Sequence, residues 1–484
     1  MLGGLAVLAA SLLSLPSQPV HIAGDGALKQ FLLDQWMNTG QITSQIEWPE
    51  PAPWAREVWE TYHYPFERPF TFEGKLVFPP FFLLLTLPFY KALGFAGLFV
   101  IPALSMIGIW VALLLILHDR DLRGWPAFVA MSLAVLSPLT YFGAMFWEHA
   151  PGVCALMFGL WLVTPRERPG TWRPGFVGRT FAGALLGAAV MLRPELIFAA
   201  AFVFAYGFFA KERKIPFLIG GGAAVALWLA INTSVTGHPL GIHAEQPRLV
   251  SGPDAWTRWS NFNLELARYC FAYYPAAMAT IILGAASCLI HRTRVSARLL
   301  VIAPIVASLS LIVFLVPYSG WYLGFRRWEL NVIPLSSLLA ADVTKRWRWA
   351  GLIILALIAV QSPQFVDLGR THKWAQNERI VAAYRKVIDR KPQAVISFSQ
   401  DAPAELSSLL REVPLVWAPP PHDFARLVGE MDTRVGIENC IAVLLRTGSE
   451  ETFALQTPDG RRIQFDWIAG DVNFFSVYEM QRLQ

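Results

Sequence analysis

Long apolar runs separated by short basic segments are the feature that most constrains the fold of this chain. The hydrocarbon core of a bilayer requires about 20 predominantly apolar residues per helix, and runs approaching this length recur through most of the sequence. They cover residues 1–15, 96–117, 126–142, 150–163, 180–192, 196–209, 215–231, 267–290, 299–317, 328–341 and 349–366. The sequence therefore predicts a mostly α-helical, polytopic bundle of about 11 transmembrane spans.

Composition agrees with a membrane protein. The 484 residues are 55% hydrophobic and 15% charged, whereas an ordinary soluble domain is about 45–50% apolar and about 25% charged. The formal net charge is only +5, and the basic residues lie in short clusters rather than in a basic domain, which argues against nucleic acid as a partner. Three of the four cysteines lie in apolar runs, so we expect no disulfide framework and no cysteine metal site.

The basic clusters predict the orientation of the bundle, because cytoplasmic loops collect Lys and Arg. If the N-terminus is cytoplasmic and residues 1–15 form the first span, the inward loops are 118–125, 164–179, 210–214, 291–298 and 342–348, each with two to four basic residues. The short outward loops contain only Arg193, Arg248, Arg258, Arg326 and Arg327. This orientation is that of a bacterial inner or plasma membrane protein with its C-terminus outside the cytoplasm.

One segment decides which loops face the cytoplasm, because an extra crossing would reverse the side of every later loop. Residues 78–90 are apolar but contain Pro79, Pro80 and Pro88, and counting them as a full crossing would turn every later basic loop outward. Their length and their prolines favour an interfacial or re-entrant helix. We therefore expect residues 16–95 to form one large outer loop with interfacial helices, rich in Trp, Tyr and Phe as segments at the lipid headgroups are.

The composition changes after the last span. Charges become frequent, and the apolar runs at 395–398, 415–417, 441–445 and 474–478 have the length of strands, while residues 374–389 and 403–411 resemble helices. We expect a transmembrane domain over residues 1–366 and a soluble extracytoplasmic α/β domain over residues 367–484. Because we find no phosphate-binding loop, His-Cys cluster or nucleophile elbow in the second domain, we interpret it as a lid or interaction module.

Two groups of polar residues near the outer face are candidates for a site. Asp25 follows the first span and lies between two glycines; it can cap a helix that begins at Gly26, or it can meet a lipid-borne substrate. Glu148 and His149 lie at the outer end of a span, where a carboxylate beside an imidazole is costly unless it is paired, solvated or bound.

Two further groups of polar residues are also predicted to lie at the outer face of the membrane. Arg193 and Glu195 interrupt an apolar stretch, where they either satisfy one another or serve a function. Tyr322, Arg326 and Arg327 lie in an aromatic outward loop, and Arg presents a fork of donors that matches a phosphate group. An interfacial belt of Trp and Arg is the alternative for this loop.

The order of these elements resembles the C-type fold (GT-C) of integral membrane glycosyltransferases, the class of the protein O-mannosyltransferases, the lipid A aminoarabinose transferase and the catalytic subunit of oligosaccharyltransferase. The resemblance covers roughly residues 1–345 and consists of loose motifs. These are Gly24-Asp25 after the first span, Phe78-Pro79-Pro80 closing the first loop, Ser137-Pro138 before the acidic Glu148, and the late Gly324-Phe325-Arg326-Arg327.

The resemblance implies an activity and roles for particular residues. In such enzymes a sugar moves from a polyprenyl-phosphate donor to a glycan, lipid or protein acceptor, and the acidic residue of the first loop, here Asp25, is catalytic. The acidic residue of the second loop, here Glu148, helps to hold a divalent metal ion in metal-dependent members, so Asp25 and Glu148 are the candidate metal ligands. Many members have Asp-Glu in the first loop, whereas this chain has Asp25-Gly26.

The chemistry that follows is glycosyl transfer. Asp25 would accept the proton of an acceptor hydroxyl, and Arg326 and Arg327, with Arg193, would stabilise the departing lipid phosphate. Glu148, His149, Glu195 and Tyr322 would complete the substrate site. The alternatives are a flippase for a lipid-linked saccharide, for which we find no internal repeat, a glycan polymerase or ligase of the same fold, and a scaffold that works through residues 370–484.

Overall fold

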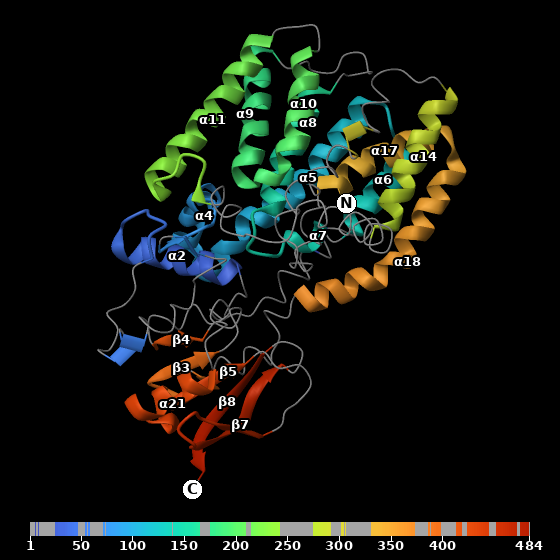
Figure 1. The fold of residues 1–484 in the computed structure, drawn as a ribbon. Coiled ribbons are helices and arrows are strands. Elements are labelled where there is room, and N and C mark those ends of the chain that lie inside the picture. The colour runs from blue at the N-terminus through green and yellow to red at the C-terminus, as the bar shows by residue number, and fades with distance from the viewer. Residues whose placement is uncertain are drawn as a thin grey trace, which may run out of the picture. The chain divides into compact units, whose positions relative to one another are not determined.

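The computed structural model describes the chain in segments that form two compact units (Figure 1). One unit comprises Met1–Leu15 and Pro79–Thr371, and the other comprises Pro16–Phe78 and His372–Gln484. The described residues are 5, 8, 25–46, 54–55, 57–58, 71–72, 74–137, 139–164, 175–209, 214–242, 274–291, 302–303, 305, 331–372, 386–387, 389–397, 413–418, 424–444, 452–471 and 475–483.

The first unit is a bundle of apolar helices whose bounds follow the predicted spans closely. Its longer helices are α4 (Pro80–Leu93), α5 (Val100–Asp119), α6 (Trp125–Val135), α8 (His149–Val163), α9 (Phe176–Leu192), α10 (Ile197–Phe209), α11 (Lys214–Thr236), α14 (Pro275–His291), α17 (Val332–Arg346) and α18 (Arg348–His372). Short pieces complete the described part: η1 (Gly94–Phe99), α7 (Leu139–Phe142) and η2 (Pro194–Leu196). Most of the predicted spans 1–15 and 299–317 lie outside the described residues.

Two of these segments are long and apolar enough to cross a membrane, Pro80–Asp119 and Lys214–Thr236, and six other apolar helices are shorter. The predicted count of 11 spans is therefore not confirmed. Within Pro80–Asp119 the chain bends at Gly94, which has a positive φ of 57°. Gly97 then lies so close to α4 that a Cβ there would overlap the carbonyl of Phe89. The predicted interfacial helix thus exists as the 14-residue α4; its depth in a bilayer stays a prediction.

Close contacts define the directions of the helices. The indole Nε1 of Trp161, near the end of α8, donates to Asp119 Oδ2 at the end of α5 over 3.1 Å, so α5 and α8 run parallel. Helix α9 runs antiparallel to α8, because a Cβ at Gly159 would contact Leu186 and one at Gly152 would lie 3.2 Å from Arg193 Cγ. The start of α8 and the end of α9 therefore share one end of the bundle.

The opposite end of the bundle gathers two of the predicted inward loops. Arg346 contacts Asp342 at 3.3 Å, and the buried Arg120 lies 4.0 Å from the same carboxylate. Trp125 Nε1 donates to the carbonyl of Arg348 over 3.3 Å. The basic segments 118–125 and 342–348 are thus in contact. This agrees with the prediction that both loops lie on the same side of the membrane.

The second unit begins with α2 (Asp25–Thr39), the helix expected after the first span. Its last turn is fixed to the segment that follows it: Trp36 Nε1 donates to the Thr43 carbonyl and Gln35 Nε2 to the Gln45 carbonyl, over 2.6 and 2.7 Å. Gln45 in turn bridges to Lys75 in the short hairpin of β1 (Thr71–Phe72) and β2 (Lys75–Leu76).

The same unit contains a six-stranded mixed sheet in the order β4-β3-β5-β8-β7-β6. The strands are β3 (Ala394–Ser397), β4 (Leu415–Trp417), β5 (Cys440–Leu444), β6 (Phe453–Gln456), β7 (Arg462–Asp471) and β8 (Phe475–Leu483), with α21 (Phe424–Arg434) and the turn η8 (Ile437–Asn439) between β4 and β5. Strands β4, β3 and β5 are parallel, and the remaining pairs are antiparallel. The C-terminal α/β region is confirmed; its predicted helices lie almost wholly outside the described residues.

The first loop and the C-terminal region share a hydrophobic core. Ala55 and Val58 are fully buried in the cluster formed by β3, β5, β7, β8 and α21. Glu57 adds an ion pair with Arg434 of α21. Although we expected residues 16–95 to accompany the bundle, residues up to Phe78 are therefore part of the unit that contains the C-terminal sheet.

Candidate functional site

A break between two apolar helices positions the first candidate residues. Helix α9 ends at Leu192, and Pro194 opens the turn η2 before α10 begins at Ile197. A proline disfavours the helical conformation in the residue before it, and Arg193 is extended, with φ −143° and ψ 102°. The sequence Arg193-Pro194-Glu195 thus ends α9 and places two charged side chains at the break before α10.

Arg193 joins two carboxylates from different elements. One terminal nitrogen lies 2.6 Å from Glu148 Oε1, just before α8, and the other contacts Glu195 Oε1 in η2. The side chains of Arg193, Glu148 and Glu195 are 12%, 3% and 7% exposed, respectively. Gly152, one turn into α8, leaves room for the arginine stem. We call these three residues the Arg193 cluster.

The Arg193 cluster has one cation and two carboxylates among its members. Burying such groups is costly, and the cost is recovered only with good geometry and further hydrogen bonds. The structure confirms that Arg193 and Glu195 contact one another and adds Glu148 as a second partner, 45 residues away in sequence. The positive charge of Arg193 is therefore largely compensated within the protein.

His149 lies beside this cluster in an aromatic setting. It is 4% exposed, and its ring centroid lies 5.2 Å from that of Phe142 and 5.4 Å from that of Trp147. Phe146 packs against Phe82 of α4 at 5.2 Å. The acidic segment before α8 is thus held by aromatic packing, which fixes the backbone of Glu148.

Asp25 is the first residue of α2, in the other compact unit. Four residues later Lys29 is 1% exposed, and its ammonium lies 5.0 Å from the ring centroid of Phe78, a cation–π distance. Residues four apart share one face of a helix, so Asp25 and Lys29 follow one another on α2. Lys29 was not among the residues predicted from the sequence, although its spacing from Asp25 was a usable signal.

The late arginine motif cannot be compared, because Tyr322, Arg326 and Arg327 lie outside the described residues. In the described part of the chain no three His, Cys, Asp or Glu side chains are grouped to hold a metal ion. The donors around Glu148 fit an ion-pair cluster rather than a metal centre, because Arg193 occupies one of its oxygens. A metal role for Asp25 and Glu148 stays a prediction.

Comparisons with known proteins bear on the fold. Neither a family model nor a curated protein matches the sequence. The apo structure of ArnT from Cupriavidus metallidurans is similar over 99% of this chain and 97% of its own, with 13% identity and a TM-score of 0.52. ArnT from the same organism bound to undecaprenyl phosphate gives the same coverage, 12% identity and a TM-score of 0.53.

A third structure is the Archaeoglobus fulgidus oligosaccharyltransferase in complex with zinc and sulfate. It is 12% identical over 91% of this chain and 67% of its own, with a TM-score of 0.44, which is too low to support a conclusion. The alignments with the two ArnT structures cover both the apolar bundle and the C-terminal sheet, because they span 99% of this chain. The chain therefore has the GT-C fold that its sequence motifs predicted.

Proposed function

We propose that this chain is a membrane glycosyltransferase that moves a sugar from a polyprenyl-phosphate donor to an acceptor glycan, lipid or protein outside the cytoplasm. The observation that carries the proposal is the Arg193 cluster, a buried group of charges at one end of an apolar bundle. Ionisable residues inside a membrane are costly and are a sign of function. The GT-C fold makes glycosyl transfer the function that this site supports best.

The proposed reaction exchanges one bond at the anomeric carbon. The acceptor hydroxyl oxygen forms the new bond to that carbon while the bond to the lipid phosphate oxygen breaks and its electron pair leaves with the phosphate. Positive charge develops on the sugar ring in such a transition state. Asp25 accepts the proton that the hydroxyl loses.

The departing phosphate requires cationic partners. Lys29 is suited to this role, because its ammonium is excluded from solvent and lies one helical turn after Asp25. A charge-assisted hydrogen bond between the Lys29 ammonium and the phosphate would be roughly twice as strong as a neutral hydrogen bond. Arg326 and Arg327 are proposed for the same role from the sequence. Arg193, already paired with two carboxylates, is better suited to hold Glu148 and Glu195 toward sugar hydroxyls.

ArnT was crystallised with undecaprenyl phosphate, which supports a donor on a lipid of this kind. A donor held in the bilayer also explains why the sequence needs no nucleotide-binding motif. His149 and Tyr322 complete the proposed substrate site. We expect the protein in the bacterial inner or plasma membrane with its N-terminus in the cytoplasm.

The test is an assay that separates transfer from transport. Purified protein is reconstituted in vesicles with a labelled polyprenyl-phosphate sugar and an extract of envelope lipids and glycans, and both labelled products and donor translocation are measured. We expect labelled acceptor from the wild type and at least about tenfold less from Arg193→Gln. Arg179→Gln, at the opposite end of α9, is the matched control. Translocation without any transfer would favour the flippase and contradict the proposal.

A further inference from the structure

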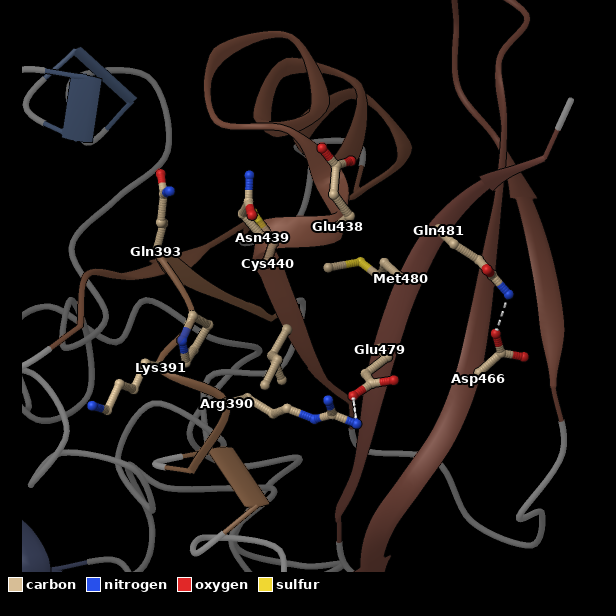
Figure 2. A pocket seen from close by; sticks show the side chains of 12 residues that line it. Arg390, Lys391, Gln393, Glu438, Asn439, Cys440, Asp466, Glu479, Met480 and Gln481 are labelled. Carbon is tan, nitrogen blue, oxygen red and sulfur yellow. Dashed lines mark hydrogen bonds and ion pairs between the residues drawn. The ribbon is translucent and has the colours of Figure 1, made fainter.

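A polar pocket in the unit of the C-terminal sheet has no part in the proposed reaction. Its volume is about 490 Å³, within the range of roughly 300–1,000 Å³ that is typical of ligand pockets. The segment before β3, the start of β5, and the neighbouring strands β7 and β8 line it. Figure 2 shows the side chains around it, with Glu479 and Asp466 on the two long strands.

The register of the sheet places this pocket on one defined face. Ile441, Glu479 and Asp466 are directly paired across β5, β8 and β7, and side chains of paired residues point to the same face. Their neighbours Ala442 and Phe465 belong to the core that contains α21. Ile441, Glu479 and Asp466 therefore line the pocket from the face of the sheet opposite α21.

Two carboxylates stand directly opposite one another on this face. Like charges at paired positions of antiparallel strands destabilise a sheet, yet the chain has Asp466 opposite Glu479. Each is compensated by its own partner, which Figure 2 shows as dashed lines: Arg390 contacts Glu479 at 2.5 Å, and Gln481 Nε2 donates to Asp466 Oδ2 over 2.6 Å.

Further hydrogen bonds fix Asp466. Gln464 Nε2 and the hydroxyl of Thr452 donate to its other oxygen over 2.8 and 3.1 Å. A carboxylate held by two amides and a hydroxyl keeps one orientation. The sheet thus carries an ordered acceptor, at the cost of the like-charge pair.

The chemistry of the lining identifies the class of ligand. Arg390 and Lys391 are balanced by Glu438, Asp466 and Glu479 among the described lining residues, so a strongly charged ligand meets repulsion from one sign or the other. The remaining polar groups include the amides of Gln393, Asn439 and Gln481, each of which both donates and accepts. Sugar hydroxyls also donate and accept, so a neutral polyhydroxylated ligand matches this surface.

A covalent reaction at this pocket is disfavoured. Cys440 is the thiol among the described lining residues, and burial, followed by Glu438 and Asp432, raises its pKa to about 12. A thiol of this kind is neutral at physiological pH, whereas the thiolate is the nucleophile. The pocket is therefore suited to binding.

We propose that this pocket binds a neutral saccharide. Asp466 and Glu479 accept hydrogen bonds from sugar hydroxyls, and Arg390, Gln481 and the neighbouring amides donate to them. The saccharide is the glycan part of the acceptor, and this role rests on the proposed function. The binding of a saccharide by the pocket does not depend on that function.

The test measures binding by the full chain in lipid nanodiscs, so that no glycoside detergent competes. The probes are arrayed neutral oligosaccharides of glucose, mannose, galactose, rhamnose and N-acetylglucosamine. We expect the wild type to bind at least one probe and Gln481→Leu to bind it about tenfold more weakly, as the loss of a hydrogen bond to a charged group implies. Gln456→Leu is the matched control, because Gln456 lies on the edge strand β6 outside the pocket and should leave binding unchanged.

The opposite results are equally defined. Absence of binding to every neutral probe, or equal binding by Gln481→Leu and the wild type, would overturn the assignment. If Gln481→Leu unfolds at a lower temperature than Gln456→Leu, Arg390→Met decides, because Arg390 is 58% exposed and its loss should weaken binding without unfolding the sheet. Transfer without probe binding contradicts the pocket alone; probe binding by a protein without transferase activity contradicts the proposed function alone.

Discussion

Arg193 illustrates how much of a site one residue can reveal. A charged tripeptide inside an apolar stretch was visible in the sequence, and its partner Glu195 lies two residues away. The second partner, Glu148, lies just before another helix, α8, and no local pattern could have assigned it, because helix directions depend on packing. His149 was likewise visible in sequence, whereas its packing against Phe142 and Trp147 required the fold.

We predict that Arg193→Met destabilises the protein by about 3–5 kcal/mol, because it leaves two buried carboxylates without their cation. Adding Glu148→Gln and Glu195→Gln to this variant should restore much of that loss. Unfolding of the wild type, the single variant and the triple variant in one detergent measures the coupling. A single variant as stable as the wild type would show that the cluster is solvated.

Among the elements, α9 and α11 pack through small residues. A Cβ at Gly183 would overlap the carbonyl of Phe217, and one at Gly220 would overlap the carbonyl of Thr180. Gly187 faces Ala224 at the same crossing. Close approach of backbones at small residues is a principal source of helix association within membranes, so these glycines fix the position of Arg193 at the end of α9.

Gly220→Ala should therefore separate the two helices and cost roughly 1–3 kcal/mol, as overpacking does. Gly222→Ala is the matched control in the same helix, because no atom beyond the adjacent residues and backbone of that helix lies within 4 Å of its Cβ position. Alanine there should be neutral or should stabilise the helix by up to about 1 kcal/mol. Melting temperatures of both variants check the prediction, and equal values would contradict the packing described.

The elements also show what the sequence could predict. Helices α5, α8, α11 and α18 follow the apolar runs, because span length is a strong local signal. Helix α21 and strand β7 were not predicted, although both have the appropriate period: Phe424, Leu427, Val428 and Met431 lie on one helical face, and Ile463, Phe465 and Trp467 alternate along a strand. The pairing of the first loop with the C-terminal sheet is nonlocal and had no such signal.

At the scale of the molecule, that pairing constrains the topology. Residues 16–78 and 372–484 form one compact unit, so both must lie on the same side of a membrane. The predicted orientation places both outside. Segments 118–125 and 342–348 lie in contact. These two basic loops are therefore at the same end of the bundle, as the predicted orientation requires.

Cysteine labelling tests the orientation. An impermeant maleimide added outside should label Ala454→Cys, which is exposed on β6, and a cysteine at residue 25, but not one at residue 170. Cys440 should not react, because burial raises its pKa to about 12. Labelling at residue 170 without labelling at residue 454 would reverse the topology.

The central claim is that Asp25 is the base of a glycosyl transfer. The most direct measurement is the rate of labelled sugar transfer from a polyprenyl-phosphate donor by Asp25→Asn in reconstituted vesicles, with Asp34→Asn on the same helix as the control. We predict a loss of about 10²–10⁴-fold for Asp25→Asn, the usual contribution of general acid–base catalysis, and a rate near that of the wild type for Asp34→Asn. Transfer at the wild-type rate by Asp25→Asn would contradict the account.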